Sequence, residues 1–262
     1  MTMRPALPLL LCLPLLACAQ PVYEVPVATP AGVQAAVAEI GQGAAPGRRS
    51  LTEAEAKAAI TRVAQRLAPA GSAVCQEVGR GAGCEWRFVY DPSTDLNAAA
   101  TGEGVIVVQR GVAEHARNDA EIAFVVAHEM AHHVADHVRS TQNRAQAGAV
   151  LGGILASLAG SYAGLETGQL AQTASGVGAQ LGVISYSKAQ EREADVLGAA
   201  ILHRAGYDIG EAREMLLTLA RLSGRTETGR LSTHPAGPDR IASFDGAVSE
   251  LQARSWRLAP GR

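Results

Sequence analysis

The sequence predicts an α+β fold that is mainly helical, with a small β-sheet beside one central helix. Apolar residues recur every three to four positions along several long segments, which is the period of helices packed on a core. Two short runs, 86–90 and 104–109, are rich in aromatic and β-branched residues and have the length of strands. With 262 residues, of which 47% are hydrophobic, the chain can bury one large core.

The N-terminal residues are expected to form a signal peptide. Arg4 precedes an apolar stretch, 6–17, that is too short to cross a bilayer as a helix. Residues 15–18 read LLAC, which resembles the lipobox of bacterial lipoproteins. That resemblance implies cleavage before Cys18 and lipid on its thiol. An ordinary secretory signal with a chance cysteine is the alternative. We therefore assign residues 1–17 to the signal peptide, 18–50 to a lipidated tether rich in Pro, Ala and Gly, 51–254 to the folded domain and 255–262 to a C-terminal tail.

The folded domain is predicted to begin with a helix over 51–67. Thr52 is a suitable N-cap and Glu55 follows three residues later, which is a capping-box pattern. Cys75 and Cys84 come next, separated by a glycine-rich loop. The oxidising compartment that a signal peptide implies favours a disulfide between them, because metal binding by the pair would need further Cys or His nearby.

The central helix carries the most informative motif. Asn118 is its predicted N-cap, and the helix is expected to run to about Ser140. Residues 128–132 read HEMAH, so His128 and His132 lie on one helix face and can present two ring nitrogens to one metal ion. Glu129 lies about 100° round the helix from His128 and can address a water in the open position of the metal. This is the HExxH pattern of zincins.

The strand over 104–109 precedes this helix, and two interpretations of it stay open. It is either a sheet edge to which an extended peptide adds or a buried core strand. After the motif, His133 and His137 are four residues apart, but valine stands where a base would be needed. We interpret both as solvated or hydrogen-bonded histidines on the opposite side of the helix. Asp136 either orients the ring of His132 or is a surface carboxylate.

The segment 145–187 contains a single charged residue, Glu166. Residues 145–165 are long enough to span a bilayer, so a membrane insertion must be considered. However, Gly, Ala and Ser make up much of the segment, which favours a pair of small-residue helices packed on the body or a hydrophobic lid. Further helices are predicted over 188–205, 211–223 and 238–254.

A catalytic zinc site needs three protein ligands, so one more must lie downstream of the two histidines. The best candidates are Glu191 and Asp195, which are one helical turn apart and face the same way. One of them can bind zinc while the other hydrogen-bonds a ligating histidine. Glu193 points to another side of the helix and is expected to be solvated.

These motifs together resemble a known family. HEMAH, Glu191-x-x-Ala194-Asp195, a Thr233-His234-Pro235 segment and Arg240-Ile241 are similar to the CAAX prenyl protease type (HtpX-like) of zinc metallopeptidase. The resemblance covers roughly residues 95–244. The bacterial members of that family include membrane-embedded heat-shock proteases and periplasmic lipoprotein proteases of outer-membrane quality control.

The resemblance implies a role for each matching residue. One zinc ion per subunit would be held by His128, His132 and Glu191, while Asp195 would support a ligand histidine and Glu129 would activate a water. Residues 51–254 would then form the metallopeptidase domain.

Three roles are open for His234, which lies in the loop before the last predicted helix. It is a fourth metal ligand that holds the enzyme silent, a hydrogen-bond donor to the oxyanion, or a loop histidine beside a turn-forming proline. Arg240 is expected to pair with an acidic residue near the site, but the sequence identifies no partner for it.

The function implied by the resemblance is hydrolysis of internal peptide bonds in misfolded or unassembled envelope proteins. The protein would face the periplasm, attached to the outer membrane through lipid on Cys18. The alternative is a chaperone-like outer-membrane assembly factor that binds its substrates through 145–187 and whose proteolysis is latched by His234. A net charge of −2 without a cluster of Lys and Arg argues against nucleic acid as a partner.

Overall fold

The computed structural model describes residues 23, 25–78, 84–146, 150, 186–223, 234 and 236–258. Within these residues the helices are α1 (Pro30–Gly41), α2 (Glu53–Val78), α3 (Arg110–His115), α4 (Asp119–Val134), α7 (Lys188–Arg204), α8 (Ile209–Ser223) and α9 (Pro238–Ala253), and the strands are β1 (Arg87–Asp91), β2 (Ala98–Thr101) and β3 (Val105–Gln109). Residues 137–146 are helical as well. The mainly helical α+β class with a small sheet is therefore confirmed.

The sheet has the strand order β1-β3-β2, in which β3 runs parallel to β1 and antiparallel to β2. The apolar sequence of β3 suits this central position, and Val105, Ile106 and Val108 are buried. Of the two interpretations of 104–109, the core strand is correct. In the part of the chain that the structure describes, the edge beside the motif helix is β2, whose short alanine-rich sequence carries little strand signal.

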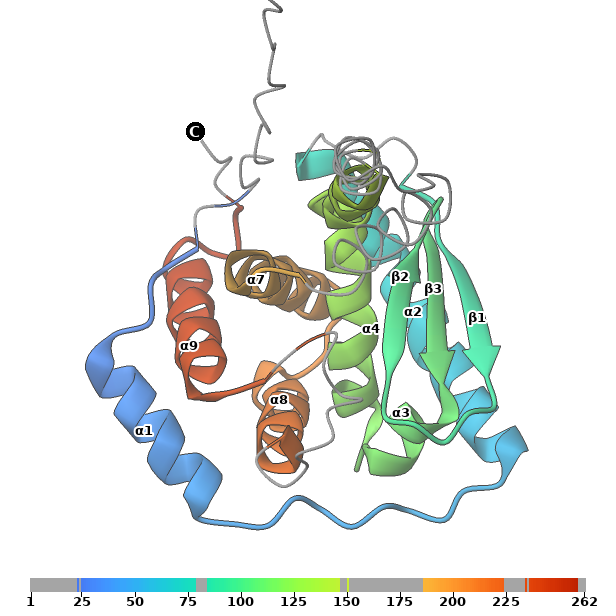
Figure 1. Ribbon diagram of the computed structural model, residues 1–262, viewed down its shortest axis with the longest axis horizontal. Helices are drawn as coiled ribbons and strands as arrows, with labels where there is room; N and C mark the ends of the chain where they lie inside the picture. Colours follow the sequence, from blue (N-terminus) through green and yellow to red (C-terminus); the bar gives the residue numbers. More distant parts are fainter. Residues whose placement is uncertain are drawn as a thin grey trace, which may run out of the picture.

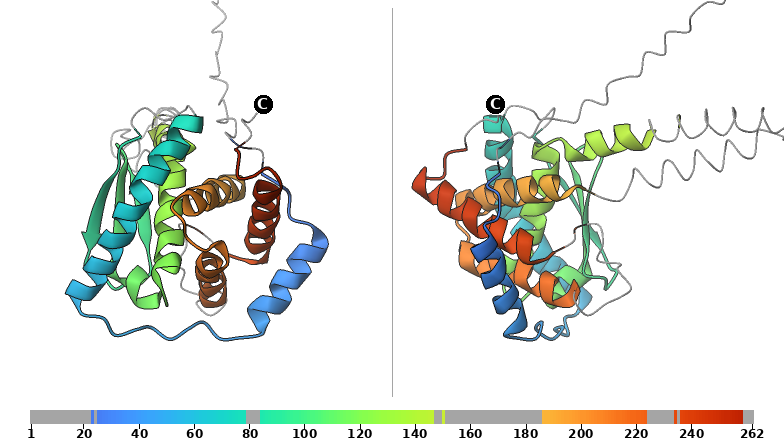
Figure 2. Two further views of the ribbon diagram at one scale, coloured as in Figure 1. Left: turned by 180° about the vertical axis from the view of Figure 1, so that it is seen from behind. Right: turned by 60° about the vertical axis from the view of Figure 1, so that its left-hand side comes forward.

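Helix α4 lies at the centre of the molecule, with elements packed on both sides (Figure 1). Helices α2 and α4 cover one face of the sheet, as the view from behind in Figure 2 shows. Helices α7, α8 and α9 lie on the other side of α4. Most of α4 is consequently buried, which is why its sequence is apolar on nearly every side around the polar motif.

Both ends of α4 are set by local signals. The Asn118 side chain accepts a hydrogen bond from the backbone N–H of Glu121 at 3.0 Å, which confirms the predicted N-cap. The helix ends at Val134, six residues before the predicted end. Asp136 then takes a left-handed backbone conformation with φ 61°, and a new helical segment begins at residue 137. This break changes the direction in which His137 points.

Helix α2 is longer than predicted and continues through Pro69 to Val78. Apolar residues on its buried face extend to Cys75, which is bonded to Cys84 in a disulfide. The hydroxyl of Ser72 donates to the carbonyl oxygen of Cys84 at 2.6 Å. These bonds tie the end of α2 to the chain that enters β1.

The stretch predicted as a tether contains a helix, because residues 30–41 form α1 and pack against α9. The signal was present in the sequence, because the Thr29 hydroxyl caps the helix and proline occupies its first position. Arg213 of α8 holds α1 in place through two 2.7 Å hydrogen bonds to Glu39. Tyr23 is also buried, with 2% of its surface exposed.

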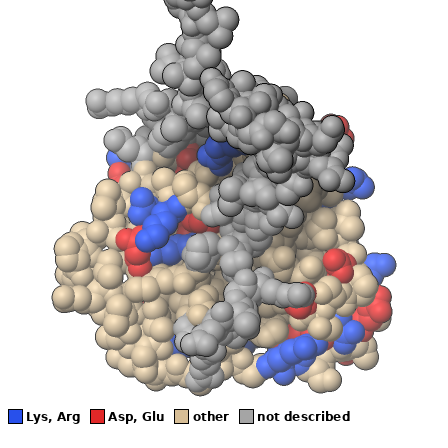
Figure 3. Space-filling view, in the orientation of Figure 1, with Lys and Arg blue, Asp and Glu red and all other residues tan. Residues whose placement is uncertain are grey.

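No described helix is long and apolar enough to cross a membrane. The prediction for 145–187 lies largely outside the described residues, since 147–149 and 151–185 are not among them. On the face shown in Figure 3, Lys and Arg side chains lie close to Asp and Glu side chains.

Candidate metal centre

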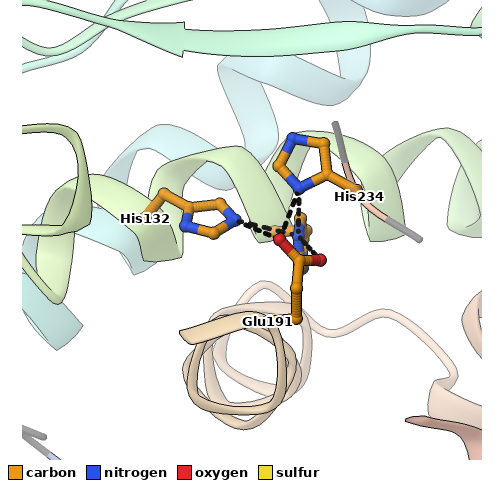
Figure 4. Close-up of side chains that lie close together, drawn as sticks. His132, Glu191 and His234 are labelled. Atoms are coloured by element: carbon orange, nitrogen blue, oxygen red, sulfur yellow. Dashed lines mark hydrogen bonds and ion pairs between the residues drawn. The ribbon is translucent and has the colours of Figure 1, made fainter. Parts of the chain in front are cut away.

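Two histidines of α4 and one glutamate of α7 face one another in the core. The helices approach closely because α7 presents small residues to α4, including Gly198 opposite the backbone of His128. His128, His132 and Glu191 are each at least 96% buried. His234 reaches the same point from the loop before α9 (Figure 4).

The donor atoms of these four residues converge. One atom from each of His128, His132, Glu191 and His234 lies within 4.8 Å of the others. The Nε2 atoms of His128 and His132 are 3.1 Å apart, and Nδ1 of His234 lies 3.2 Å from Nε2 of His128 and 2.9 Å from Oε1 of Glu191. Nε2 of His132 is 3.5 Å from the same Glu191 oxygen.

This spacing fits a single metal ion. Four ligands at the usual zinc–nitrogen distance of about 2.0–2.1 Å stand about 3.3 Å from one another in a tetrahedron. The four separations given above, 2.9–3.5 Å, bracket that value, and all four donor atoms lie within 4.8 Å of one another. Imidazole nitrogens with one carboxylate are also a donor set that zinc prefers. The residues present therefore fit the metal that the HExxH pattern implies.

The site is electrostatically prepared for a cation. Burial would raise the pKa of Glu191, but Arg240 and the neighbouring histidines outweigh this effect and hold its pKa well below the ordinary value. Burial lowers the pKa of His132 well below its ordinary value, so this ring is neutral, as a metal ligand must be. For His128, burial and Arg240 lower the pKa, but Asp195 and Glu191 overcome them and raise it to about 9. The carboxylates thus draw positive charge to the centre.

A buried ion-pair network supports the ligands from behind. Asp195 accepts two hydrogen bonds from Arg240, at 2.6 and 2.7 Å, and lies 2.9 Å from Nδ1 of His128. Arg240 also lies 2.9 Å from the second oxygen of Glu191. The acidic partners of Arg240, which the sequence did not identify, are therefore Asp195 and Glu191.

Glu129 lies beside the cluster and is 2% exposed. Its Oε2 accepts a 2.8 Å hydrogen bond from the backbone N–H of Ala100 in β2. Its other oxygen lies 3.3 Å from Nε2 of His234. The carboxylate is thus fixed between the edge strand and the four converging donors, where it can take up a proton from a group at the centre.

Tyr186 was missed from the sequence, and Glu193 and His137 were misassigned. Tyr186 stacks on His132, with ring centroids 3.8 Å apart, and no motif marks it. Glu193 was expected in solvent but is 3% exposed and lies 3.2 Å from His137. His137 was expected on the opposite side of the helix but is 2% exposed and contacts the His132 ring. Of the two interpretations of Asp136, the surface carboxylate is correct, because it pairs with Arg139.

The structure brings together the residues that the sequence singled out for metal binding and base catalysis: His128, Glu129, His132, Glu191, Asp195 and His234. It also joins Cys75 to Cys84. Cys18 lies outside the described residues. His133 is separate from the cluster, with its ring 3.3 Å from the carbonyl oxygen of Val105.

The HExxH helix, the carboxylate on a second helix and the small sheet beside them define a zincin-like metallopeptidase. Comparison with protein families gives the particular group. The model of peptidase family M48 matches residues 55–248, and the chain belongs to this family. The finer assignment to the CAAX prenyl protease type stays a prediction.

Several relatives carry informative names. The chain is 32% identical to the mitochondrial metalloendopeptidase OMA1 of Arabidopsis thaliana over 158 residues. These aligned residues are 60% of this chain and 30% of the relative. Over 172 residues it is 30% identical to the beta-barrel assembly-enhancing protease of Escherichia coli K12, covering 64% of this chain and 35% of the relative. The putative beta-barrel assembly-enhancing protease of Vibrio cholerae is 28% identical over 171 residues, or 63% of this chain and 35% of the relative. The chain thus spans about a third of the length of these relatives.

Proposed function

We propose that the chain is a zinc-dependent endopeptidase that cleaves misfolded or unassembled proteins of the bacterial cell envelope. One observation carries the proposal: the Nε2 atoms of His128 and His132 converge with the carboxylate of Glu191 while Glu129 stands beside them. Zinc bound there would polarise a peptide carbonyl and make a bound water acidic. Glu129 is the proposed base that accepts the water proton and passes it to the leaving amine.

The position of Glu129 suits this role. Burial beside the cluster keeps bulk water away from its carboxylate, and the hydrogen bond from Ala100 fixes the orientation of one oxygen. The other oxygen faces His234 and the converging donors. A base held in this way needs no rearrangement before it takes the proton.

The edge strand β2 is the proposed binding site for the substrate backbone. The carbonyl oxygen of Asn97, the residue before β2, accepts a hydrogen bond from the backbone N–H of Gln109 in β3. The backbone groups of successive residues point to alternate sides of a strand. Ala98 and Ala100 therefore direct their backbone groups away from β3, as the bond from Ala100 to Glu129 also indicates. An extended peptide that adds to β2 would pass beside Glu129.

The described geometry also favours a latched resting state. His234 takes the fourth corner of the donor cluster, where a catalytic water would have to bind. The adjoining cavity, lined by residues that include Phe124, Leu219 and Arg240, has a volume of only about 40 Å³. His234 forms part of the wall of this cavity, so its displacement would widen the approach to the donor cluster.

The second candidate function follows from this contact. It is a chaperone-like outer-membrane assembly factor whose proteolysis is latent until His234 is displaced. The names of the Escherichia coli and Vibrio cholerae relatives support both an envelope location and a link to β-barrel assembly. Attachment through lipid on Cys18 to the outer membrane belongs to the same proposal.

The Glu129→Gln variant tests the proposed activity. The amide keeps the size of the side chain but cannot accept the proton, so cleavage of casein or of an unfolded outer-membrane protein should be lost. Zinc measured by atomic absorption should stay at one per chain, because Glu129 is not a proposed ligand. Cleavage by the variant at the wild-type rate would refute the assignment of the base.

The His234→Ala variant discriminates the two candidate functions. If His234 is a latch, the variant should cleave casein several-fold faster than the wild-type chain while keeping its zinc. If the rate does not change, the latch is excluded and the constitutive endopeptidase remains. A rate that falls would instead assign His234 to oxyanion stabilisation.

A further inference from the structure

The two ligand histidines of α4 are supported in different ways. A histidine that binds a metal through Nε2 carries a proton on Nδ1, and this proton needs an acceptor that fixes the ring. For His128 the acceptor is Asp195, at 2.9 Å. For His132 the atom next to Nδ1 is another ring nitrogen, Nδ1 of His137, at 3.0 Å.

The hydrogen bonds beyond His132 have a single consistent direction. If Nε2 of His132 faces the metal, its Nδ1–H donates, so Nδ1 of His137 must accept. The proton of His137 then lies on Nε2, which is 3.2 Å from the carboxylate of Glu193. The Nδ1–H group of each ligand histidine is therefore linked by hydrogen bonds to a buried carboxylate. The link is direct for His128 and runs through the imidazole of His137 for His132.

Glu193 is held on its far side by the N-terminal segment. Its Oε1 accepts a 2.9 Å hydrogen bond from the backbone N–H of Tyr23, and its residue surface is 3% exposed. His137 is 2% exposed. Burying a carboxylate and an imidazole is unfavourable unless each is hydrogen-bonded. The hydrogen bonds from Glu193 through His137 to Nδ1 of His132 satisfy these buried groups and fix the orientation of the His132 ring.

We propose that His137 and Glu193 are positioning residues that hold His132 in the tautomer and orientation required for metal binding. Neither residue touches the reacting atoms. The inference rests on the proposed function, because it assigns His132 to the metal. It explains why the chain turns sharply at Asp136: the left-handed residue ends α4 and lets His137 face back toward His132.

The test measures zinc affinity by competition with a chelator, using the full chain. His137→Leu removes both ring nitrogens, and Glu193→Gln removes the terminal charge. Each should weaken zinc binding at least tenfold, since the loss of such supporting partners costs about 10–100-fold. His137→Gln retains one acceptor and one donor and should stay within a few-fold of wild type.

Glu114→Gln is the matched control for a buried carboxylate. Glu114 is 1% exposed and pairs with Arg48 and Arg110 away from the metal centre, so its loss should change stability without changing zinc affinity. Wild-type affinity in both His137→Leu and Glu193→Gln would overturn the inference. If His137→Leu does not fold, Glu193→Gln alone decides.

A spectroscopic readout separates positioning from a general effect on folding. Long-range ¹H–¹⁵N correlation spectra of the zinc-loaded wild-type chain should show His132 protonated on Nδ1 and His137 protonated on Nε2. His137 protonated on Nδ1 would contradict the inference while leaving the proposed function intact. A wild-type chain that binds no zinc would overturn both.

Discussion

Replacement of Arg240 by methionine should destabilise the protein strongly. The guanidinium is 5% exposed and makes two hydrogen bonds to Asp195 and an ion pair with Glu191, both of which are 2% exposed. Methionine fills similar space but leaves two buried carboxylates without this cation. Removing one partner of a buried pair costs about 3–5 kcal/mol. That is a large part of the 5–15 kcal/mol by which folded domains are usually stable.

The assay is urea unfolding followed by circular dichroism, with EDTA present so that metal does not replace the lost charge. Arg62→Met is the matched control, because Arg62 also makes a two-bond pair, with Asp119 at 2.8 and 2.7 Å, but its side chain is 59% exposed. The Arg62→Met control should lower the free energy of unfolding by about 1 kcal/mol or less. If Arg240→Met lowers the free energy of unfolding by no more than Arg62→Met does, burial does not set the cost of losing the ion pair.

Two further predictions concern the elements that surround the site. Arg213 holds the pKa of Glu39 below its ordinary value of 4.5, so this ion pair stabilises the fold above that pH and is lost as the pH falls through the lowered pKa. Glu39→Gln should therefore be less stable than wild type in urea at pH 7, and the gap should narrow below about pH 4.5; an unchanged gap would contradict the assignment. Replacing Cys75 and Cys84 by serine should cost about 2.5 kcal/mol, the loop-closure value for their separation of nine residues. Thermal unfolding with and without a reductant checks this, because the reduced wild-type chain should be as stable as the double variant. If the oxidised wild-type chain is also no more stable than the double variant, a stabilising disulfide is excluded.

The metal cluster was largely predictable because helical periodicity determines it. His128 and His132 share a face of α4, and Glu191 and Asp195 share a face of α7. Packing of the two buried faces then leaves few ways for the polar residues to be satisfied except by one another. That is why a pattern of spacings within the chain could anticipate contacts between distant segments.

The supporting residues were not predictable by the same reasoning. A continuous helix to Ser140 would have kept His137 away from His132, and the break at Asp136 depends on one residue in a left-handed conformation. The burial of Glu193 likewise depends on the docking of Tyr23 from a segment distant in sequence. Such tertiary contacts leave no periodic signal.

Among the elements that the sequence did not predict, β2 and α1 were missed for a different reason. The strand β2 has the sequence AAAT, whose intrinsic strand propensity is low, and it forms because β3 offers an antiparallel partner. Helix α1 lies in a stretch whose proline and glycine content resembles a linker. Its capping threonine and first-position proline were the local evidence against that interpretation.

We propose that one zinc ion is bound by His128, His132 and Glu191 beside the base Glu129. The most direct test is a crystal structure of the zinc-loaded Glu129→Gln chain with anomalous data collected at the zinc edge. The proposed site predicts one strong peak at about 2.0–2.2 Å from Nε2 of both histidines and from a carboxylate oxygen of Glu191. A peak at another set of residues, or a zinc ion held without Glu191, would contradict it.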